Sequence, residues 1–396
     1  MASNTNSRAI TSFRRICLYA YITGLPYFWY EEPKWSVYVD KFHKMLTFIS
    51  NVINCLFYGA EFFSFFTQKN LTERQTIDQI IFTLSNPFIF WNCIAMTYYK
   101  EEVRALIHSL VLFLPSVYND KKVERKMAKK SRLYVGLLLS TVLATLLLYG
   151  IDNYIRSFKG GVFTTIITAW PKVEDTSQLA GIGRVLVYIV WIEFMFRVCG
   201  AVSIVMSLTI NTSHQYIQLQ SYFHSLNNIF QEKLSQEEKE KKYEAHLKVG
   251  IQQHIKILSL TNKLKKTCML VYGCQIIINM IILVMCLLVM VSGNMSFTKL
   301  MSYIGLALCS TTTNGFYMCT IGDITVEASN LTSAMYCSGW ENCGRGSSLR
   351  VRKLLGVAMA QTQNPLIIKT LGLVPVSYSS YLSIIKSSYS VFSVIY

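Results

Sequence analysis

The sequence is poor in charged residues and in proline. Of its 396 residues, 15% are charged and 7 are prolines, whereas 52% are hydrophobic. Soluble globular proteins carry about 25% charged residues, so this composition argues against an ordinary soluble enzyme of this length. It is typical of a helical protein that crosses a membrane several times.

The sequence also lacks the short motifs of common enzymes and metal sites. It contains no HExxH, no GxSxG and no GxxxxGK[ST], and "GIGRVL" (Gly181 to Leu186) lacks the third glycine of a dinucleotide site. Cys337 and Cys343 are not spaced as zinc ligands. Most of the 11 cysteines lie within apolar runs, which does not indicate a disulfide framework. We therefore expect no enzymatic activity, no cofactor and no metal.

Long apolar runs are what the sequence has instead. A helix of roughly 20 mostly apolar residues crosses a ~30 Å hydrocarbon core. Seven such runs are present, at residues 45–66, 77–98, 133–152, 185–210, 267–291, 299–321 and 372–396. The fold class predicted is an all-α membrane protein with seven transmembrane helices.

Basic residues are distributed unevenly between the segments that join these runs. If the amino terminus is cytoplasmic, the inner segments hold 29 of the 38 Lys and Arg residues and the outer loops hold 7. The positive-inside rule then predicts a cytoplasmic amino terminus and an extracellular carboxy terminus. The net charge of +16 follows from this bias and indicates anionic lipid as a partner, whereas the apolar composition opposes a nucleic-acid surface.

The chain divides into four predicted parts. Residues 1–44 form a cytoplasmic segment, 45–321 hold helices one to six with a cytoplasmic extension at 211–266, 322–371 form a cytoplasmic anchor, and 372–396 form the seventh helix. Within the first part, "RRICLYAYITGLPYFWY" (Arg14 to Tyr30) has no small-residue cleavage site. We predict a short interfacial helix there, with its Tyr and Trp residues at headgroup depth.

The extension at 211–266 shows helical periodicity on both sides of a charged centre. One stripe is Leu219, Phe223, Leu226 and Phe230, and the other is Tyr243, Leu247, Ile251, Ile255 and Leu258. If the fourth helix continues unbroken to Phe230, it is roughly 70 Å long, more than twice the membrane thickness. We expect a packed cytoplasmic stalk; a disordered loop is the alternative.

Ionisable side chains within the runs are candidate functional groups. Glu193 and Arg197 are four residues apart, the spacing at which opposite charges meet on one helix face, and we predict a structural ion pair. Glu61 has no sequence-local partner and either faces a water-filled cavity or contacts another helix.

Aromatic and polar side chains gather in the outer halves of several runs. A pocket for a small, mostly apolar molecule needs an apolar wall with a few orienting polar groups, although such residues also serve simple packing. The candidate ligand-binding residues are Phe82, Asn86, Phe90, Thr145, Tyr149, Tyr188, Trp191 and Tyr303.

The last run has two distinct faces on a helical wheel. Ser379, Ser383, Ser387 and Ser390 share one face, and Tyr381, Ile385, Tyr389, Phe392 and Tyr396 share the opposite one. The small face suits close helix packing. The aromatic face suits either lipid at the outer interface or a hydrophobic constriction in a pore.

The carboxy-terminal part resembles the insect odorant receptor family. The similarity lies in "SAMYCSGW" (Ser333 to Trp340) and "RKLLGVAMAQTQNPLIIKTLGLVPVSYSSYLSIIKSSYSVF" (Arg352 to Phe392). In that family an Ala-x-Tyr…Trp stretch, a cytoplasmic helix, a G-x-x-x-x-S motif and a K-x-S-Y-S-x-F close occur in this order. The seven runs, the inverted orientation, the length and the absence of a polar tail agree with it. The acidic residue common before the tryptophan is Gly339 here.

The resemblance implies an odorant-gated, non-selective cation channel in the plasma membrane of a sensory dendrite. It implies a tetramer with the olfactory coreceptor, a volatile apolar ligand bound in the outer halves of helices two, three, four and six, and an anchor between subunits at the cytoplasmic ends of helices four to seven. The last helices would surround the pore, with the gate at Tyr389, Phe392 and Tyr396.

Two other classes of seven-helix or polytopic protein remain as alternatives. A G-protein-coupled chemoreceptor has the opposite orientation, and this sequence has no Asp-Arg-Tyr after the third run and no Asn-Pro-x-x-Tyr in the last. A transporter is disfavoured because the chain shows no matched pair of broken helices and no internal repeat.

Overall fold

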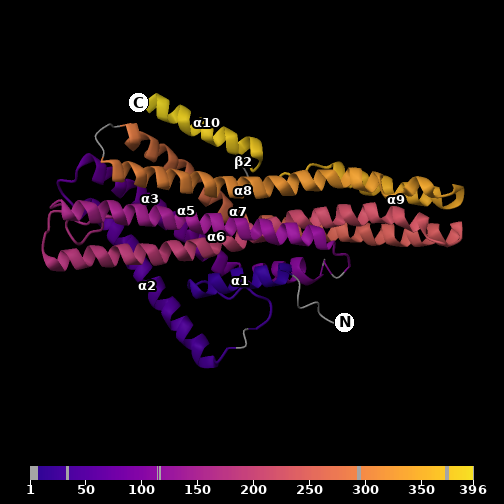
Figure 1. Ribbon diagram of the computed structural model, residues 1–396, viewed down its shortest axis with the longest axis horizontal. Helices are drawn as coiled ribbons and strands as arrows, with labels where there is room; N and C mark the ends of the chain where they lie inside the picture. Colours follow the sequence, from indigo (N-terminus) through magenta and orange to yellow (C-terminus); the bar gives the residue numbers. More distant parts are fainter. Residues whose placement is uncertain are drawn as a thin grey trace.

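Long helices running side by side form nearly all of the molecule (Figure 1). The computed structural model describes residues 8–32, 35–113, 115, 117–291, 296–370 and 374–395. The helices are α1 (Arg8–Ile22), α2 (Val37–Thr67), α3 (Glu73–Tyr98), α4 (Lys100–His108), the π-helix η1 (Ser109–Phe113), α5 (Lys121–Phe158), α6 (Gln178–Leu226), the 3₁₀ turn η2 (Asn227–Gln231), α7 (Gln236–Val291), α8 (Phe297–Tyr336), the 3₁₀ turn η3 (Trp340–Asn342), α9 (Arg345–Gln363) and α10 (Tyr378–Ile395).

Local capping explains where several helices begin. At α3 the Thr72 hydroxyl accepts the N–H of Gln75, and the Gln75 side chain accepts the N–H of Thr72 at 2.9 Å, which is a capping box. The Asp120 carboxylate accepts the N–H of Lys122 before α5, and the Ser177 hydroxyl accepts the N–H of Ala180 before α6. These side chains replace the hydrogen bonds that the first turn of a helix lacks.

Six of the seven apolar runs lie on helices, in order α2, α3, α5, α6, α7 and α8, and α10 covers the last run from Tyr378 onward. Residues 372, 373 and 396 of the last run lie outside the described part of the chain. Within the described residues, five helices are long and apolar enough to cross a membrane: α2, α3, α5, α6 and α7. The polar stretch Ser310 to Gly315 interrupts the apolar run on α8, although the helix itself is continuous there. The count of seven spans stays a prediction.

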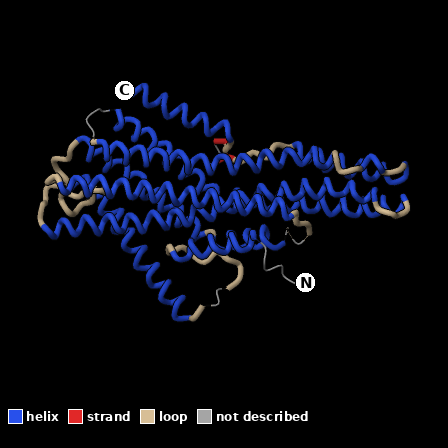
Figure 2. Tube along the Cα trace, in the orientation of Figure 1, coloured by secondary structure: helices blue, strands red, loops and turns tan. Residues whose placement is uncertain are grey.

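The two longest helices extend well beyond a membrane thickness. α6 has 49 residues and α7 has 56, which at 1.5 Å per residue corresponds to about 74 and 84 Å. α6 is unbroken to Leu226, four residues short of the predicted end, and η2 then leads towards α7. Figure 1 shows their junction at one end of the elongated bundle, where α9 lies beside them. Figure 2 shows how little of this stalk is loop.

The stalk packs along a stripe that differs in part from the one predicted. Leu219, Phe223, Tyr243 and Leu247 are buried as expected, but Ile255 is 60% exposed. Steps of four residues advance about 40° beyond a full turn, so a series of them leaves the buried face. On α7 the buried stripe therefore alternates steps of three and four, through Tyr243, Leu247, Gly250, His254, Ile257, Thr261 and Leu264.

The amino-terminal helix lies earlier in the chain than predicted. α1 ends at Ile22, because Gly24 takes φ +88° and redirects the backbone. Phe28 and Trp29 are then part of a loop and are 0% and 1% exposed. These two aromatic rings belong to the protein core, and the headgroup depth of the Tyr and Trp residues in this segment stays a prediction. α1 itself packs against α5 and α6.

The segment between α8 and α10 contains a short departure from the all-α prediction. β1 (Lys369–Thr370) and β2 (Val374–Pro375) pair antiparallel just before α10 (Figure 2). Earlier in the same segment, Gly339 takes φ +92°, and a Cβ there would lie 2.6 Å from Asn227 Oδ1. A side chain does not fit, which accounts for glycine where the resembling family has an acidic residue.

The loop between α5 and α6 folds back over the ends of neighbouring helices. The Gln68 side chain, just after α2, donates to the carbonyls of Thr168 and Pro171 at 2.6 and 2.9 Å. Arg184 of α6 donates to the carbonyls of Lys172 and Asp175 at 2.6 Å each. These bonds to the backbone hold the loop without regular secondary structure. Within it, the Ser177 N–H donated to the Asp175 carboxylate lowers the pKa of that group.

Close packing between α6 and α7 in the stalk generates a first prediction. A Cβ at Gly250 would lie 2.8 Å from Phe223 Cε1 and 3.0 Å from Tyr222 Cε1. Gly250→Ala is expected to destabilise the fold by roughly 1–3 kcal/mol through overpacking, measured as a lower thermal unfolding temperature of the purified chain. Gly136→Ala is the control, because Gly136 is exposed within α5 and has nothing within 4 Å of its Cβ position. An unchanged unfolding temperature for Gly250→Ala would contradict the packing described.

Candidate functional site

Five helices enclose a cavity inside the bundle. Side chains of α3, α5, α6, α7 and α8 line a volume of about 80 Å³. Most of the wall is apolar, and its members include Ile81, Phe82, Ile89, Leu138, Val142, Trp191, Met195, Val198, Val202, Ile282 and Leu306. A few polar side chains complete it: Ser85, Gln275, Asn279, Ser310 and Thr313. This combination is what a site for a small, mostly apolar molecule requires.

An aromatic cluster forms one side of the cavity. The rings of Phe82, Tyr149 and Trp191 meet edge to face, with centroids 5.2 to 5.7 Å apart. Tyr303 contacts Tyr149 at 6.4 Å, and Tyr188 lies 6.2 Å from Trp191. Such edge contacts fix the ring orientations. The indole N–H of Trp191 is buried and has no hydrogen-bond partner among the described residues.

Amide side chains of α3, α7 and α8 form a continuous hydrogen-bonded ladder. Asn92 donates to Gln275 at 2.8 Å, Gln275 donates to Asn279 at 3.1 Å, and Asn279 donates to Asn314 at 3.0 Å. The Ser310 hydroxyl donates to the Asn279 carbonyl at 2.7 Å. The ladder ties α3, α7 and α8 together, and two of its amides, Gln275 and Asn279, also line the cavity. Each primary amide has two N–H donors and two lone pairs, so each of these side chains can bond to its neighbours on both sides at once.

A buried ion pair lies next to the aromatic cluster. Lys299 Nζ and Tyr303 Oη each lie 2.6 Å from the Asp78 carboxylate. The side chains of Lys299 and Asp78 are 2% and 9% exposed. The Lys299 ammonium also lies 5.0 Å from the centre of the Tyr303 ring and 5.5 Å from that of Tyr149. The pair joins α3 to α8, and leaving either charge alone in this setting would be strongly destabilising.

The eight candidate ligand-binding residues fall into four groups. Phe82 and Trp191 line the cavity, and Tyr149, Tyr188 and Tyr303 stand behind them in the aromatic cluster. Thr145 lies at the contact of α5 with α8, where its hydroxyl donates to the Gly305 carbonyl at 3.1 Å. Asn86 and Phe90 do not line this cavity. Contact of any of the eight with a ligand stays a prediction.

Asn86 and Phe90 face α2 and the far side of α6. Asn86 donates to Glu61 at 2.6 Å, and both side chains are fully buried. Glu61 therefore contacts another helix, the second of the two options left open. Phe90 packs against Tyr58 and Phe194, with ring centroids at 5.1 and 6.2 Å.

The predicted ion pair of Glu193 with Arg197 is wrong. Within the described residues, no carboxylate oxygen lies within 4 Å of the Arg197 guanidinium. Both side chains turn towards α2 and meet at Ser50, which donates to Glu193 at 2.8 Å and accepts from Arg197 Nη1 at 3.5 Å. Asn54 also donates to Glu193, at 3.3 Å. Polar groups on the neighbouring helix thus replace the contact within α6.

The sequence interpretation missed the polar side of the cavity. Gln275 and Asn279 are four residues apart in an otherwise apolar run, which is a signal that places two amides on one helix face. The Asp78–Lys299 pair gave no such signal, because 221 residues separate the partners.

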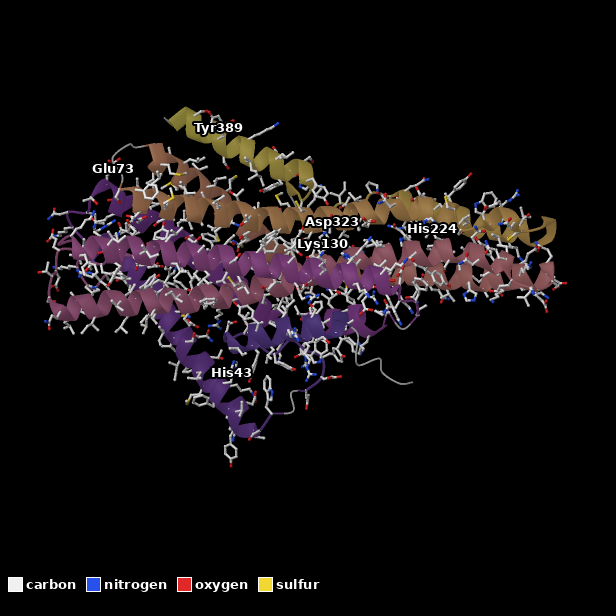
Figure 3. All side chains as sticks on the ribbon, viewed as in Figure 1. His43, Glu73, Lys130, His224, Asp323 and Tyr389 are labelled. Atoms are coloured by element: carbon white, nitrogen blue, oxygen red, sulfur yellow. The ribbon has the colours of Figure 1, made fainter. Side chains whose placement is uncertain are left out.

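Two of the three predicted gate residues, Tyr389 and Phe392, lie on α10, which stands at the edge of the bundle (Figure 1). Tyr389 is 64% exposed and is labelled in Figure 3. The side chain of Phe392 and all of Tyr396 lie outside the described part of the chain. The serine face of Ser379, Ser383, Ser387 and Ser390 is exposed, whereas Tyr381 and Ile385 are half-buried. If the serine face packs closely, it packs against another molecule.

Comparison with known proteins identifies the family. The sequence matches the family model described as 7tm Odorant receptor over residues 74–389. The fold is similar to that of the insect olfactory receptor OR5 from Machilis hrabei, with a TM-score of 0.80 to its complex with eugenol and 0.78 to a second structure of the receptor. In both comparisons identity is 12% and 96% of each chain is covered.

No curated protein matches the sequence. At 12% identity the solved structures show a shared fold alone, whereas the family model covers most of the chain. Together with the five apolar helices, the family match identifies a multi-pass membrane receptor rather than an enzyme. The chain belongs to the odorant receptor family.

Proposed function

We propose that the chain is the odorant- or pheromone-binding subunit of a ligand-gated, non-selective cation channel. It assembles with the olfactory coreceptor as a tetramer in the plasma membrane of a sensory dendrite. The observation that carries the proposal is an enclosed, mostly apolar cavity with a few polar groups, set within a fold of the odorant receptor family. A neighbour in that fold was solved in complex with eugenol, a small aromatic molecule.

The cavity dimensions and its polar groups define the ligand class. A cavity of about 150 Å³ holds benzene, and this one measures about 80 Å³. A volatile ligand therefore enters only if side chains move, and Met195 is flexible enough to do so. The unpaired N–H of Trp191 favours a ligand that carries an oxygen acceptor, such as an alcohol, aldehyde, ketone or ester.

The channel part of the proposal rests on α10 and on topology. We propose that α8 and α10 are the sixth and seventh spans, with the amino terminus cytoplasmic and the carboxy terminus extracellular. The bias of basic residues supports this orientation. α10 carries exposed residues along its length, among them Leu382 and Tyr389, which suits a helix covered by other subunits around a pore.

A cluster at the base of α10 connects this helix to those that line the cavity. The Asp323 carboxylate of α8 pairs with Lys130 of α5 and accepts a hydrogen bond from Tyr378, the first residue of α10. Figure 3 labels Lys130 and Asp323 side by side. Because α5 and α8 both line the cavity, this cluster supports a route by which ligand binding displaces α10. We propose that it couples the cavity to the pore.

The function is tested by whole-cell currents in cells that express the chain with and without the coreceptor. A panel of volatile compounds is applied while G-protein signalling is blocked. The expected result is a rapid cation current that needs the coreceptor and survives the block. Silence under the block, with responses restored when G proteins are freed, would overturn the channel and favour a G-protein-coupled receptor.

A hydrogen bond from the Trp191 indole N–H to the ligand predicts that removing this N–H lowers sensitivity to oxygenated ligands more than to hydrocarbons. Trp191→Phe keeps an aromatic ring but removes the indole N–H, so the half-maximal concentration for an oxygenated ligand is expected to rise roughly three- to tenfold, the worth of one hydrogen bond. Hydrocarbon ligands of similar size are expected to lose less. Trp91→Phe is the matched control, because Trp91 is 48% exposed on α3. Equal losses for both ligand types would contradict a hydrogen bond from Trp191.

If the cluster of Lys130, Asp323 and Tyr378 couples the cavity to the pore, disrupting it is expected to lower the maximal current rather than the ligand affinity. Asp323→Asn removes the charge that pairs with Lys130 and weakens the bond from Tyr378, so α10 follows the cavity helices less closely. The maximal current is expected to fall severalfold, while ligand affinity of the purified receptor stays within about twofold. Lys386→Gln, an exposed change on α10, is the control. A fall in affinity without a fall in maximal current would place Asp323 in binding instead.

A further inference from the structure

A second cavity lies where α2 diverges from the bundle (Figure 1). It measures about 730 Å³ and is bounded by the end of α1, the loop that follows it, the first half of α2, the junction of α3 with α4, and Arg197 of α6. Its chemistry differs from that of the first cavity, since it mixes basic side chains with aromatic ones. Figure 3 labels His43, one of its lining residues, on the diverging part of α2.

Arg197 is the most unusual group in this cavity. Its side chain is 3% exposed, yet its Nε has no hydrogen-bond partner in the described structure. Arg197 Nη1 donates to the Ser50 hydroxyl at 3.5 Å, and that hydroxyl in turn donates to Glu193. The guanidinium and the Glu193 carboxylate are therefore not in direct contact. A buried guanidinium offers five donors and is stable when an anion receives them. The described protein supplies no such anion in direct contact.

A second unpaired donor converges on the same point. The Thr47 hydroxyl is buried without a partner. A Cβ placed on Gly24 would lie 3.8 Å from Arg197 Nε and 3.9 Å from Thr47 Oγ1. Gly24 is a glycine with φ +88°, so the backbone approaches this point without a side chain to fill it. Three elements, α2, α6 and the loop after α1, thus leave two free donors around one small space.

The remaining charges of the lining are largely paired with one another or with a neighbouring carboxylate, which leaves Arg197 as the group for an anion. Besides Arg197, the lining contains the cations Lys44, Lys100 and Arg104 and the carboxylates Glu32 and Asp40. Asp40 is already paired with Lys44 at 2.7 Å. Lys100 and Arg104 lie 3.8 and 3.5 Å from the Glu101 carboxylate. Arg197 is therefore the lining cation that has no carboxylate within 4 Å among the described residues.

We propose that this cavity binds a phosphate-bearing anion, and that the anion is the headgroup of a membrane phospholipid. The lipid source follows from the surroundings. Val37 and Phe48 line the cavity and are 67% and 68% exposed, and Met45, Ile49 and Val52 continue the exposed apolar surface of α2. A phosphate held by Arg197 and Thr47 would place its acyl chains along this surface, as anionic lipids do beside basic segments.

The test measures lipid binding directly on the purified full-length chain. A fluorescent short-chain phosphatidylinositol 4,5-bisphosphate is titrated by polarisation, with soluble inositol 1,4,5-trisphosphate and inorganic phosphate as competitors. Arg197→Gln is expected to weaken binding roughly tenfold or more, because it removes charge-assisted bonds. Thr47→Val is expected to weaken it roughly threefold without lowering the unfolding temperature, since its hydroxyl has no partner in the free protein. Lys41→Gln is the matched control, an exposed charge change on α2 outside the cavity.

The outcomes distinguish a phosphate site at Arg197 and Thr47 from its absence, and a lipid headgroup from a soluble phosphate. Weaker binding by Arg197→Gln and Thr47→Val, with Lys41→Gln unchanged, supports the site. Equal binding by all variants overturns it, and if Arg197→Gln fails to fold, Thr47→Val alone decides. Soluble trisphosphate that competes as strongly as the lipid would overturn the lipid assignment. The assay contains neither odorant nor coreceptor, so failure of the channel proposal would leave its result intact.

Discussion

The structure depends on α6, a helix that is buried on every side through its middle. Residues 198–216 are all buried, although they include hydroxyl, amide and imidazole side chains. These groups tolerate burial because they bond to their own helix: Thr209, Thr212 and Asn211 donate to the carbonyls of Val205, Leu208 and Ser207. A helix whose polar side chains mostly bond to its own backbone can be surrounded by apolar and small residues, although Ser203 Oγ and Asn211 Oδ1 are buried without a partner in the described structure. α1, α3, α5, α7 and α8 pack against it, and the cavities lie on its two sides.

Most of the helical architecture was predictable because its causes are local. Run length and hydropathy depend on residues that are close in sequence. Six of the runs fall on helices, and most of the last run falls on α10. The stalk was also predictable as helix, but not its exact face, since a series of four-residue steps drifts around the axis. The end of α1 was missed because a single glycine with positive φ, Gly24, outweighs the apolar pattern that follows it.

The candidate site was predictable only in part, because it depends on how helices are rotated against one another. Phe82, Asn86 and Phe90 look like one face, yet eight residues turn a helix by about 80° beyond two full turns. That rotation takes Phe82 to the cavity and Phe90 to the far side of α6. Spacing within one helix likewise allowed Glu193 to meet Arg197, but α2 offers Ser50 and Asn54 to the same groups. Contacts between helices compete with contacts within one, and a single sequence does not rank them.

The two cavities share α6 as a common wall, and this has a mechanical consequence. Arg197 faces the basic cavity, whereas its neighbour Val198 faces the apolar one. A ligand that enlarges the apolar cavity by moving α6 therefore moves the guanidinium in the other. If binding in one cavity changes affinity in the other, the reverse holds by the same factor. Binding of the anion in the basic cavity would then stabilise one position of α6. Through that position it would raise or lower the affinity of the apolar cavity for its ligand. The buried Asp78–Lys299 pair ties α3 to α8 beside the aromatic cluster, so these two walls of the apolar cavity are expected to move together.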